Sequence, residues 1–138
     1  MDLTERTITQ LIKIHGTNDP MRVAAQKRIE VLFEDLGKNI WGYYACFNRI
    51  PSIHINFRLD EFRARFAIAH ELGHHFLHPG INTPFLRKNT LFSIDKIERE
   101  ANRFAIKLII GNSQPEYGET KKSFLLRCCI PEELHVFY

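Results

Sequence analysis

The residues of this chain that are best suited to chemistry lie within the stretch AHELGHHFLH, residues 69–78. Within it, His70, Glu71 and His74 form the pattern H-E-x-x-H. On a helix, residues four apart lie on one face about one turn from each other, so two imidazoles can bind one Zn²⁺. A glutamate beside the first histidine can take a proton from a zinc-bound water. The pattern therefore predicts a catalytic zinc site, with His70 and His74 as ligands and Glu71 as the general base.

The alternative is that these histidines are polar residues on an exposed helix face. Chance placement produces H-E-x-x-H in roughly 2% of chains of this composition, so the motif alone has a measurable false-positive rate. Its surroundings are apolar, however, because Phe62, Phe66 and Phe76 belong to the same predicted helix. Such a helix is mostly buried, and buried histidines need polar partners. The context therefore favours the metal site.

A catalytic zinc ion usually has three protein ligands, and the segment IEREANRFA offers two candidates for the third, Glu98 and Glu100. On a helical wheel the two glutamates lie on opposite edges of the apolar stripe. The edge with Glu100 also carries three cations: Lys96, Arg103 and Lys107. Glu98 instead shares its edge with Asn102, which favours Glu98 as the ligand. The competing interpretation is that Glu98 forms a capping box with Asp95.

Two further polar residues lie close to the predicted site. Asn102 could orient His70 or His74 through the ring nitrogen that does not bind zinc, or it could be a helix-face amide without a partner. His78 is one turn beyond His74, but a Pro-Gly pair follows it directly. We therefore interpret His78 as a helix-terminal residue that interacts favourably with the helix dipole.

The elements predicted to position these residues are helices around a small sheet. Hydrophobic periodicity predicts helices at residues 3–15, 20–28, 60–77, 94–110 and 120–129. Segments rich in β-branched and aromatic residues predict strands at residues 29–36, 40–47 and 52–57. About three antiparallel strands need a helix to cover their apolar face, so we expect an α+β fold. The terminal segments are expected to be helical.

Length and composition are typical of one soluble domain. The 138 residues predict a single domain over 1–138, with residues 114–138 as a C-terminal helical tail. The net charge of +3 comes without a dense block of basic residues, so direct nucleic-acid binding is not expected. Three cysteines, two of them adjacent, are a poor disulfide framework. No signal peptide or membrane-spanning run is evident, and we expect a cytoplasmic protein that does not bind membranes.

The segment FAIAHELGHHFLH, followed after a loop by IEREANRFAIKLII, resembles the ImmA/IrrE family of zinc metallopeptidases. The early HGTNDP and the segment IHIN are similar to members carried by phages and other mobile elements. The resemblance implies a zincin-like fold, a Zn²⁺ cofactor held by His70, His74 and Glu98, and Glu71 as general base. It also implies that the protein cleaves a DNA-binding repressor as its partner. One departure is LIIGNS, where relatives often have a Leu-Leu-Met-Pro segment.

For peptide-bond hydrolysis, the strand SIHINF is a candidate to bind substrate. We expect it to be an edge strand that pairs with an extended peptide through Ile53, His54, Ile55 and Asn56. The loop Ile81–Ser93 could form a specificity pocket or a lid.

Two other functions remain open at this point. The chain could be a zinc-containing antirepressor that binds and sequesters the repressor without cutting it, although pure binding needs no Glu71. It could also be a toxin-like or non-peptide metallohydrolase.

Overall fold

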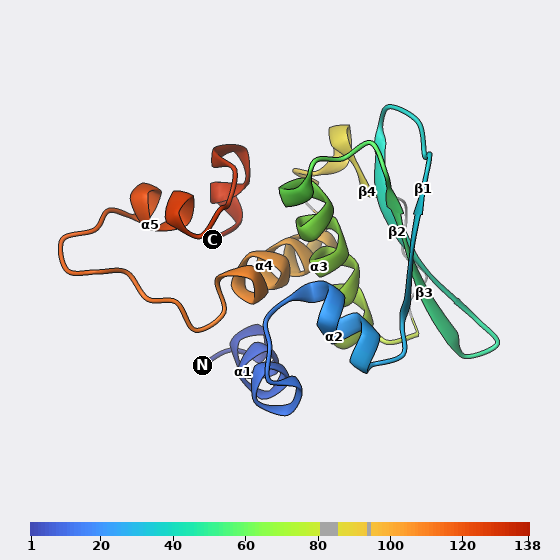
Figure 1. Cartoon of the computed structure of the whole chain (residues 1–138), viewed down its shortest axis with the longest axis horizontal. Coiled ribbons are helices and arrows are strands. Elements are labelled where there is room, and N and C mark those ends of the chain that lie inside the picture. Colours follow the sequence, from blue (N-terminus) through green and yellow to red (C-terminus); the bar gives the residue numbers. More distant parts are fainter. Residues whose placement is uncertain (81–85, 94) are drawn as a thin grey trace.

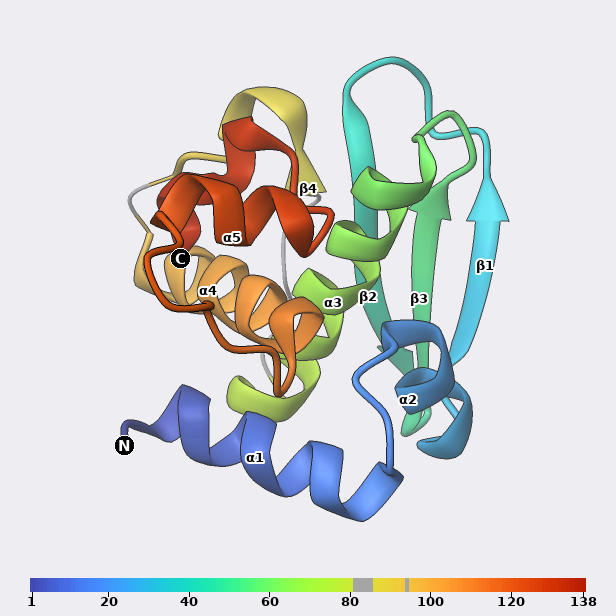
Figure 2. The same cartoon turned by 60° about the vertical axis from the view of Figure 1, so that its left-hand side comes forward.

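The computed structural model describes residues 1–80, 86–93 and 95–138. The helices are α1 (Leu3–His15), α2 (Pro20–Gln26), α3 (Glu61–Leu77), α4 (Lys96–Ile110) and α5 (Lys121–Arg127), with short 3-10 helices η1 (Lys88–Thr90) and η2 (Glu132–Phe137). The strands are β1 (Glu30–Glu34), β2 (Ile40–Phe47), β3 (Ile50–Asn56) and β4 (Leu86–Arg87). The sheet packs on α3, and α1, α4 and α5 lie on the other side of α3 (Figures 1 and 2). The predicted α+β class is confirmed.

The sheet differs from the predicted antiparallel one. Its four strands follow the order β1-β3-β2-β4, and β1 pairs with β3 in parallel, with Val31 opposite Ile53. The other two pairings, β2 with β3 and β2 with β4, are antiparallel. Alternation of apolar residues predicts a strand but carries no information on the direction of its neighbour. The two residues of β4 are too few for any periodic signal.

The prediction that residues 52–57 form an edge strand is wrong, because β3 lies between β1 and β2. Both of its hydrogen-bonding sides are therefore occupied, and no peptide can add to it. Ile53 and Ile55 are fully buried in the core. His54, on the other face, stacks on Tyr43 with ring centroids 4.4 Å apart and contacts Glu34 through Nδ1 at 2.5 Å.

Asn56 has a structural task at the end of β3. Its Nδ2 donates hydrogen bonds to the carbonyl oxygens of Gly37 and Ile40, both at 2.7 Å. Its Oδ1 accepts from the backbone N–H of Leu36 at 3.3 Å. This buried amide therefore holds the turn between β1 and β2.

Helix α3 is the central element of the fold. Every residue from Phe66 to His74 is buried, because the sheet covers one side of the helix and α4 the other. The mid-helix Gly73 permits this contact, since a Cβ there would lie 3.1 Å from the ring of Phe104 in α4. The carboxylate of Asp60 caps the helix by accepting from the N–H of Arg63 at 2.8 Å.

The C-terminal end of α4 is held by the loop between α1 and α2. The side chain of Asn18 donates to the carbonyl oxygens of Leu108 and Ile109, at 3.2 and 2.9 Å. Gly111 follows with a positive φ of 61°. The segment LIIGNS is therefore a helix end capped by Asn18, which comes from the HGTNDP segment. Across the described residues, no helix is long and apolar enough to span a bilayer.

Candidate metal centre

Helices α3 and α4 bring His70, His74 and Glu98 together as a buried cluster. The two Nε2 atoms of the histidines lie 3.2 Å apart. The carboxylate of Glu98 faces both of them, with Oε2 3.2 Å from His70 Nε2 and Oε1 2.9 Å from His74 Nε2. The three candidate ligand atoms lie within 4.8 Å of one another. Sequence reasoning thus selected three residues that the fold juxtaposes.

Asn102 determines which nitrogen of His70 carries the proton. Its Nδ2 donates to the carbonyl oxygen of Leu91 at 2.9 Å, so its Oδ1 is oriented toward His70 and accepts from Nδ1–H at 2.8 Å. A neutral imidazole with a proton on Nδ1 has its lone pair on Nε2. That lone pair is directed toward His74 and Glu98. Asn102 therefore has the orienting contact that was one of its two predicted roles.

The donor set fits a divalent metal ion. Two imidazole nitrogens and one carboxylate converge on one point, a combination typical of catalytic zinc sites. Glu98 Oε1 has no contact with hydrogen-bond geometry among the described residues, despite its short distance to His74 Nε2. A cation between these atoms would satisfy the carboxylate and both nitrogens at once.

Glu71 lies beside this cluster and is fully buried. Within the described part of the chain, neither of its carboxylate oxygens has a hydrogen-bond partner. Burial raises the pKa of Glu71 to about 8, with the charge of Glu98 adding to the effect. Burial also acts to raise the pKa of Glu98, but its contacts with His70 and His74 outweigh this and lower that pKa to about 2.

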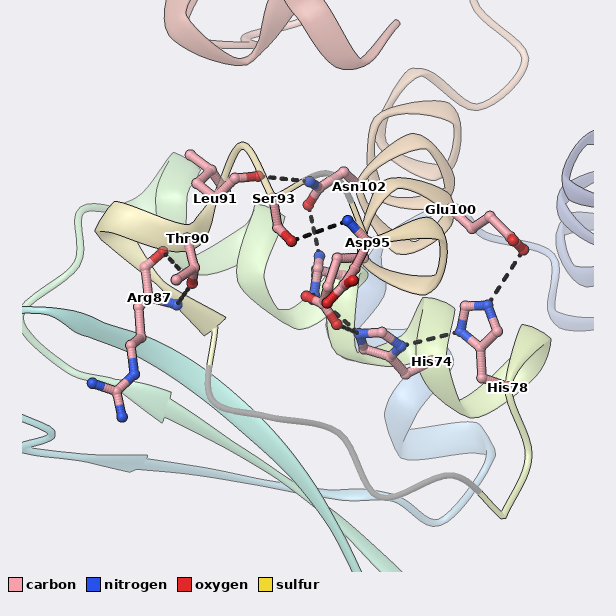
Figure 3. A network of polar contacts seen from close by, with 11 residues as sticks. His74, His78, Arg87, Thr90, Leu91, Ser93, Asp95, Glu100 and Asn102 are labelled. Carbon is pink, nitrogen blue, oxygen red and sulfur yellow. Dashed lines mark hydrogen bonds and ion pairs between the residues drawn. The ribbon is translucent and has the colours of Figure 1, made fainter.

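The structure adds two residues that sequence reasoning assigned elsewhere. His78 Nδ1 lies 3.1 Å from His74 Nδ1, and His78 Nε2 lies 3.3 Å from Glu100 Oε2 (Figure 3). The helix keeps its hydrogen bond from His78 N–H to the His74 carbonyl at 2.9 Å, so His78 stays on the face of His74. The i, i+4, i+8 spacing of His70, His74 and His78 in the sequence could have predicted that the three rings lie on one face.

The competing interpretation of Glu98 is not found among the described residues. Asp95 makes no side-chain cap hydrogen bond among the described residues, so there is no capping box with Glu98. Arg103, which shares an edge of α4 with Glu100, pairs with Glu5 of α1 and with Asp2, the N-cap residue of that helix.

The loop predicted as a pocket or lid is described only in part. Residues 81–85 lie outside the described residues. Leu86–Arg87 form β4 and Lys88–Thr90 form η1. The carbonyl of Leu91 supports Asn102, so this part of the loop contacts the centre indirectly.

Sequence comparisons agree with this geometry. Residues 24–120 match the profile of the Peptidase M78 family, described as an IrrE N-terminal-like domain. The chain therefore belongs to this metallopeptidase family, and the resemblance to ImmA/IrrE is confirmed.

Two relatives in Bacillus and its phages are similar over most of the chain. It is 41% identical to "Uncharacterized immunity region protein 2" of Bacillus phage phi105 over 108 residues, which are 78% of this chain and 68% of that protein. It is 36% identical to "Metallopeptidase ImmA" of Bacillus subtilis (strain 168) over 104 residues, 75% of this chain and 60% of ImmA. No solved structure matches the chain.

Proposed function

We propose that this protein is a zinc-dependent endopeptidase that cleaves a DNA-binding repressor of a phage or mobile element. The observation that carries the proposal is the unpaired, buried Glu71 carboxylate beside the His70, His74 and Glu98 cluster in a chain of a metallopeptidase family. A purely structural metal site needs no such carboxylate.

Each residue of the cluster has a defined task in this proposal. His70, His74 and Glu98 hold the metal, and Asn102 keeps His70 in the tautomer that leaves Nε2 free. When bound, Zn²⁺ supplies Lewis acidity, which polarises a peptide carbonyl and makes a water molecule more acidic. Glu71 takes the proton of the attacking water and delivers it to the leaving amine nitrogen. The water oxygen bonds to the peptide carbonyl carbon, and the C–N bond breaks as the amine receives the proton, so no covalent enzyme intermediate forms.

The choice of a repressor as substrate rests on the relatives. One is named an immunity region protein of a phage and the other a metallopeptidase. A repressor acts on DNA, so we place the reaction in the cytoplasm. The absence of a dense basic segment in the sequence agrees with recognition of the repressor protein rather than of its DNA.

We also propose that residues 1–138 fold as one domain. The C-terminal tail packs on the helices that hold the site, since Phe137 of η2 stacks on Phe66 of α3 with ring centroids 6.1 Å apart. Arg63 of α3 forms an ion pair with Glu133 of η2.

The test is co-expression with a DNA-binding repressor of the phage or mobile element that carries the gene, followed by intact-mass measurement. Wild type is expected to yield a discrete fragment pair. Glu71→Gln is expected to bind Zn²⁺ and repressor but to cleave about 10²- to 10⁴-fold more slowly, because it lacks the general base. Glu61→Gln, the same change at an exposed position of α3, is the matched control and should cleave like wild type.

Two results would contradict the proposal. Cleavage by Glu71→Gln at the wild-type rate would remove Glu71 from the mechanism. An intact repressor that co-purifies with the wild-type protein would instead identify a non-cleaving antirepressor.

A further inference from the structure

His70 and His74 of α3, and His78 directly after its last residue, follow one another at intervals of one turn, and α4 supplies a polar partner to each. Glu98 faces His70 and His74, and Glu100 faces His78 (Figure 3). We propose that His78, held by Glu100, is a positioning residue of the metal centre, which sets the tautomer and ring orientation of His74. The inference rests on the metal site of the proposed function.

The contact with Glu100 determines which ring nitrogens of His78 and His74 carry protons. Its carboxylate only accepts hydrogen bonds, so His78 Nε2–H donates to Glu100 Oε2 at 3.3 Å. The Nδ1 of a neutral His78 is then the acceptor that faces His74. His74 Nδ1–H donates to it at 3.1 Å, which leaves the His74 Nε2 lone pair directed at Glu98 and His70. The Glu100 carboxylate, acting through the His78 ring, thus leaves His74 Nε2 free to bind a metal ion.

The two ligand histidines therefore have equivalent support on their outer nitrogens. His70 Nδ1 meets the amide oxygen of Asn102, and His74 Nδ1 meets the ring of His78. Residues that hold the outer nitrogen of a metal-bound histidine typically change metal affinity by 10- to 100-fold when they are replaced.

The burial of the His78 side chain distinguishes its contact with His74 from an incidental contact at a helix end. The His78 side chain is 7% exposed, although it follows the last residue of α3. The Glu100 side chain is 33% exposed, so solvent reaches the acidic end of this contact. A favourable interaction with the helix dipole does not by itself require a specific contact with the ring of His74.

The test compares isosteric variants at position 78. Leucine and asparagine have nearly the same shape, but only asparagine keeps an acceptor near the position of Nδ1. We expect His78→Leu to weaken Zn²⁺ binding about 10- to 100-fold in chelator competition, and His78→Asn to stay within about 3-fold of wild type. Glu100→Leu should weaken binding by a smaller factor. His75→Leu, the same substitution at the adjacent histidine, is the matched control and should bind like wild type.

A second readout is independent of the metal. Long-range ¹H–¹⁵N spectra of the metal-free protein report which ring nitrogen of His74 is protonated. We expect the Nδ1–H form in wild type and His78→Asn, and a mixture of both tautomers in His78→Leu. Thermal melting of the metal-free variants shows whether each is folded.

The outcomes distinguish this inference from the function on which it rests. Wild-type Zn²⁺ affinity in folded His78→Leu, or equal losses in His78→Leu and His78→Asn, would overturn the positioning role. A wild-type protein that binds no Zn²⁺ would overturn the metal site of the proposed function. In that case the His74 tautomer would still test the contact with His78.

Discussion

At the residue scale, the site depends on side chains whose hydrogen-bonding groups are only partly satisfied by the rest of the described protein. His70 is held by Asn102 through Nδ1, whereas its Nε2 faces His74 and Glu98. Glu71 has no hydrogen-bond partner within the described residues, although it is fully buried. A buried polar group without a partner is costly, and this cost supports the catalytic role that we propose for Glu71.

The amide of Asn102 gives a prediction at this scale. Asn102→Leu keeps the shape of the side chain but removes the acceptor from His70 and the donor from the buried Leu91 carbonyl. We expect the free energy of unfolding to fall by about 1–3 kcal/mol, because a buried polar group loses its partner. Zn²⁺ affinity should fall by about 10- to 100-fold. Urea unfolding and chelator competition measure the two effects.

The control for this prediction is the same substitution at an exposed asparagine. Asn112→Leu should change the free energy of unfolding by no more than about 0.5 kcal/mol. An Asn102→Leu variant with unchanged Zn²⁺ affinity would remove Asn102 from the site.

At the element scale, the close packing of α3 on α4 decides which side chains meet. Gly73 has no Cβ, and this allows the ring of Phe104 to approach α3 one residue away from His74. Glu98 and Asn102 of α4 reach His70 across the same helix contact. The glycine is therefore part of the geometry of the site although it carries no functional group.

Gly73→Ala tests this contact. Alanine favours a helix interior by about 1 kcal/mol over glycine. Its Cβ would lie 3.1 Å from the fully buried Phe104 ring, and overpacking of this kind costs about 1–3 kcal/mol. We expect a net loss of up to about 2 kcal/mol in the free energy of unfolding. Chemical denaturation measures it.

A double-mutant cycle supplies the control for Gly73→Ala. The smaller side chain in Phe104→Leu should accommodate the new methyl group, so the two changes together should cost less than the sum of the single changes. Additive effects, or a stabilised Gly73→Ala variant, would show that α4 adjusts to the methyl group.

At the scale of the whole molecule, the sheet and the outer helices enclose α3 and leave a buried cluster of ionisable groups at its centre. His70, His74, Glu71 and Glu98 are all buried. A divalent cation that binds His70, His74 and Glu98 in the folded protein but not in the unfolded chain stabilises the fold by mass action.

Metal removal should therefore lower thermal stability. At a free Zn²⁺ concentration of 100 times Kd, the stabilisation is about 2.7 kcal/mol, and a chelator should abolish it. Calorimetry is expected to show a Tm several degrees higher with Zn²⁺ than with chelator. Glu61→Gln should keep this shift and His74→Gln should lose most of it. A wild-type Tm that does not depend on Zn²⁺ would argue against the site.

The sequence by itself determined the features that depend on local spacing. Two histidines four residues apart share a helix face in any helix, so His70, Glu71 and His74 were predictable from the motif. The wheel position of Glu98 relative to the cationic edge of the same helix was predictable in the same way, as were the helices themselves and the α+β class.

Only the tertiary structure decided how these elements meet. It placed β3 inside the sheet rather than at its edge, added β4, and brought Glu100 to His78. It also decided that Asn102 meets His70 rather than His74. The physical reason is range: the 3.6-residue period governs neighbours within a helix, whereas strand order and the register of α4 on α3 depend on contacts between segments far apart in the chain.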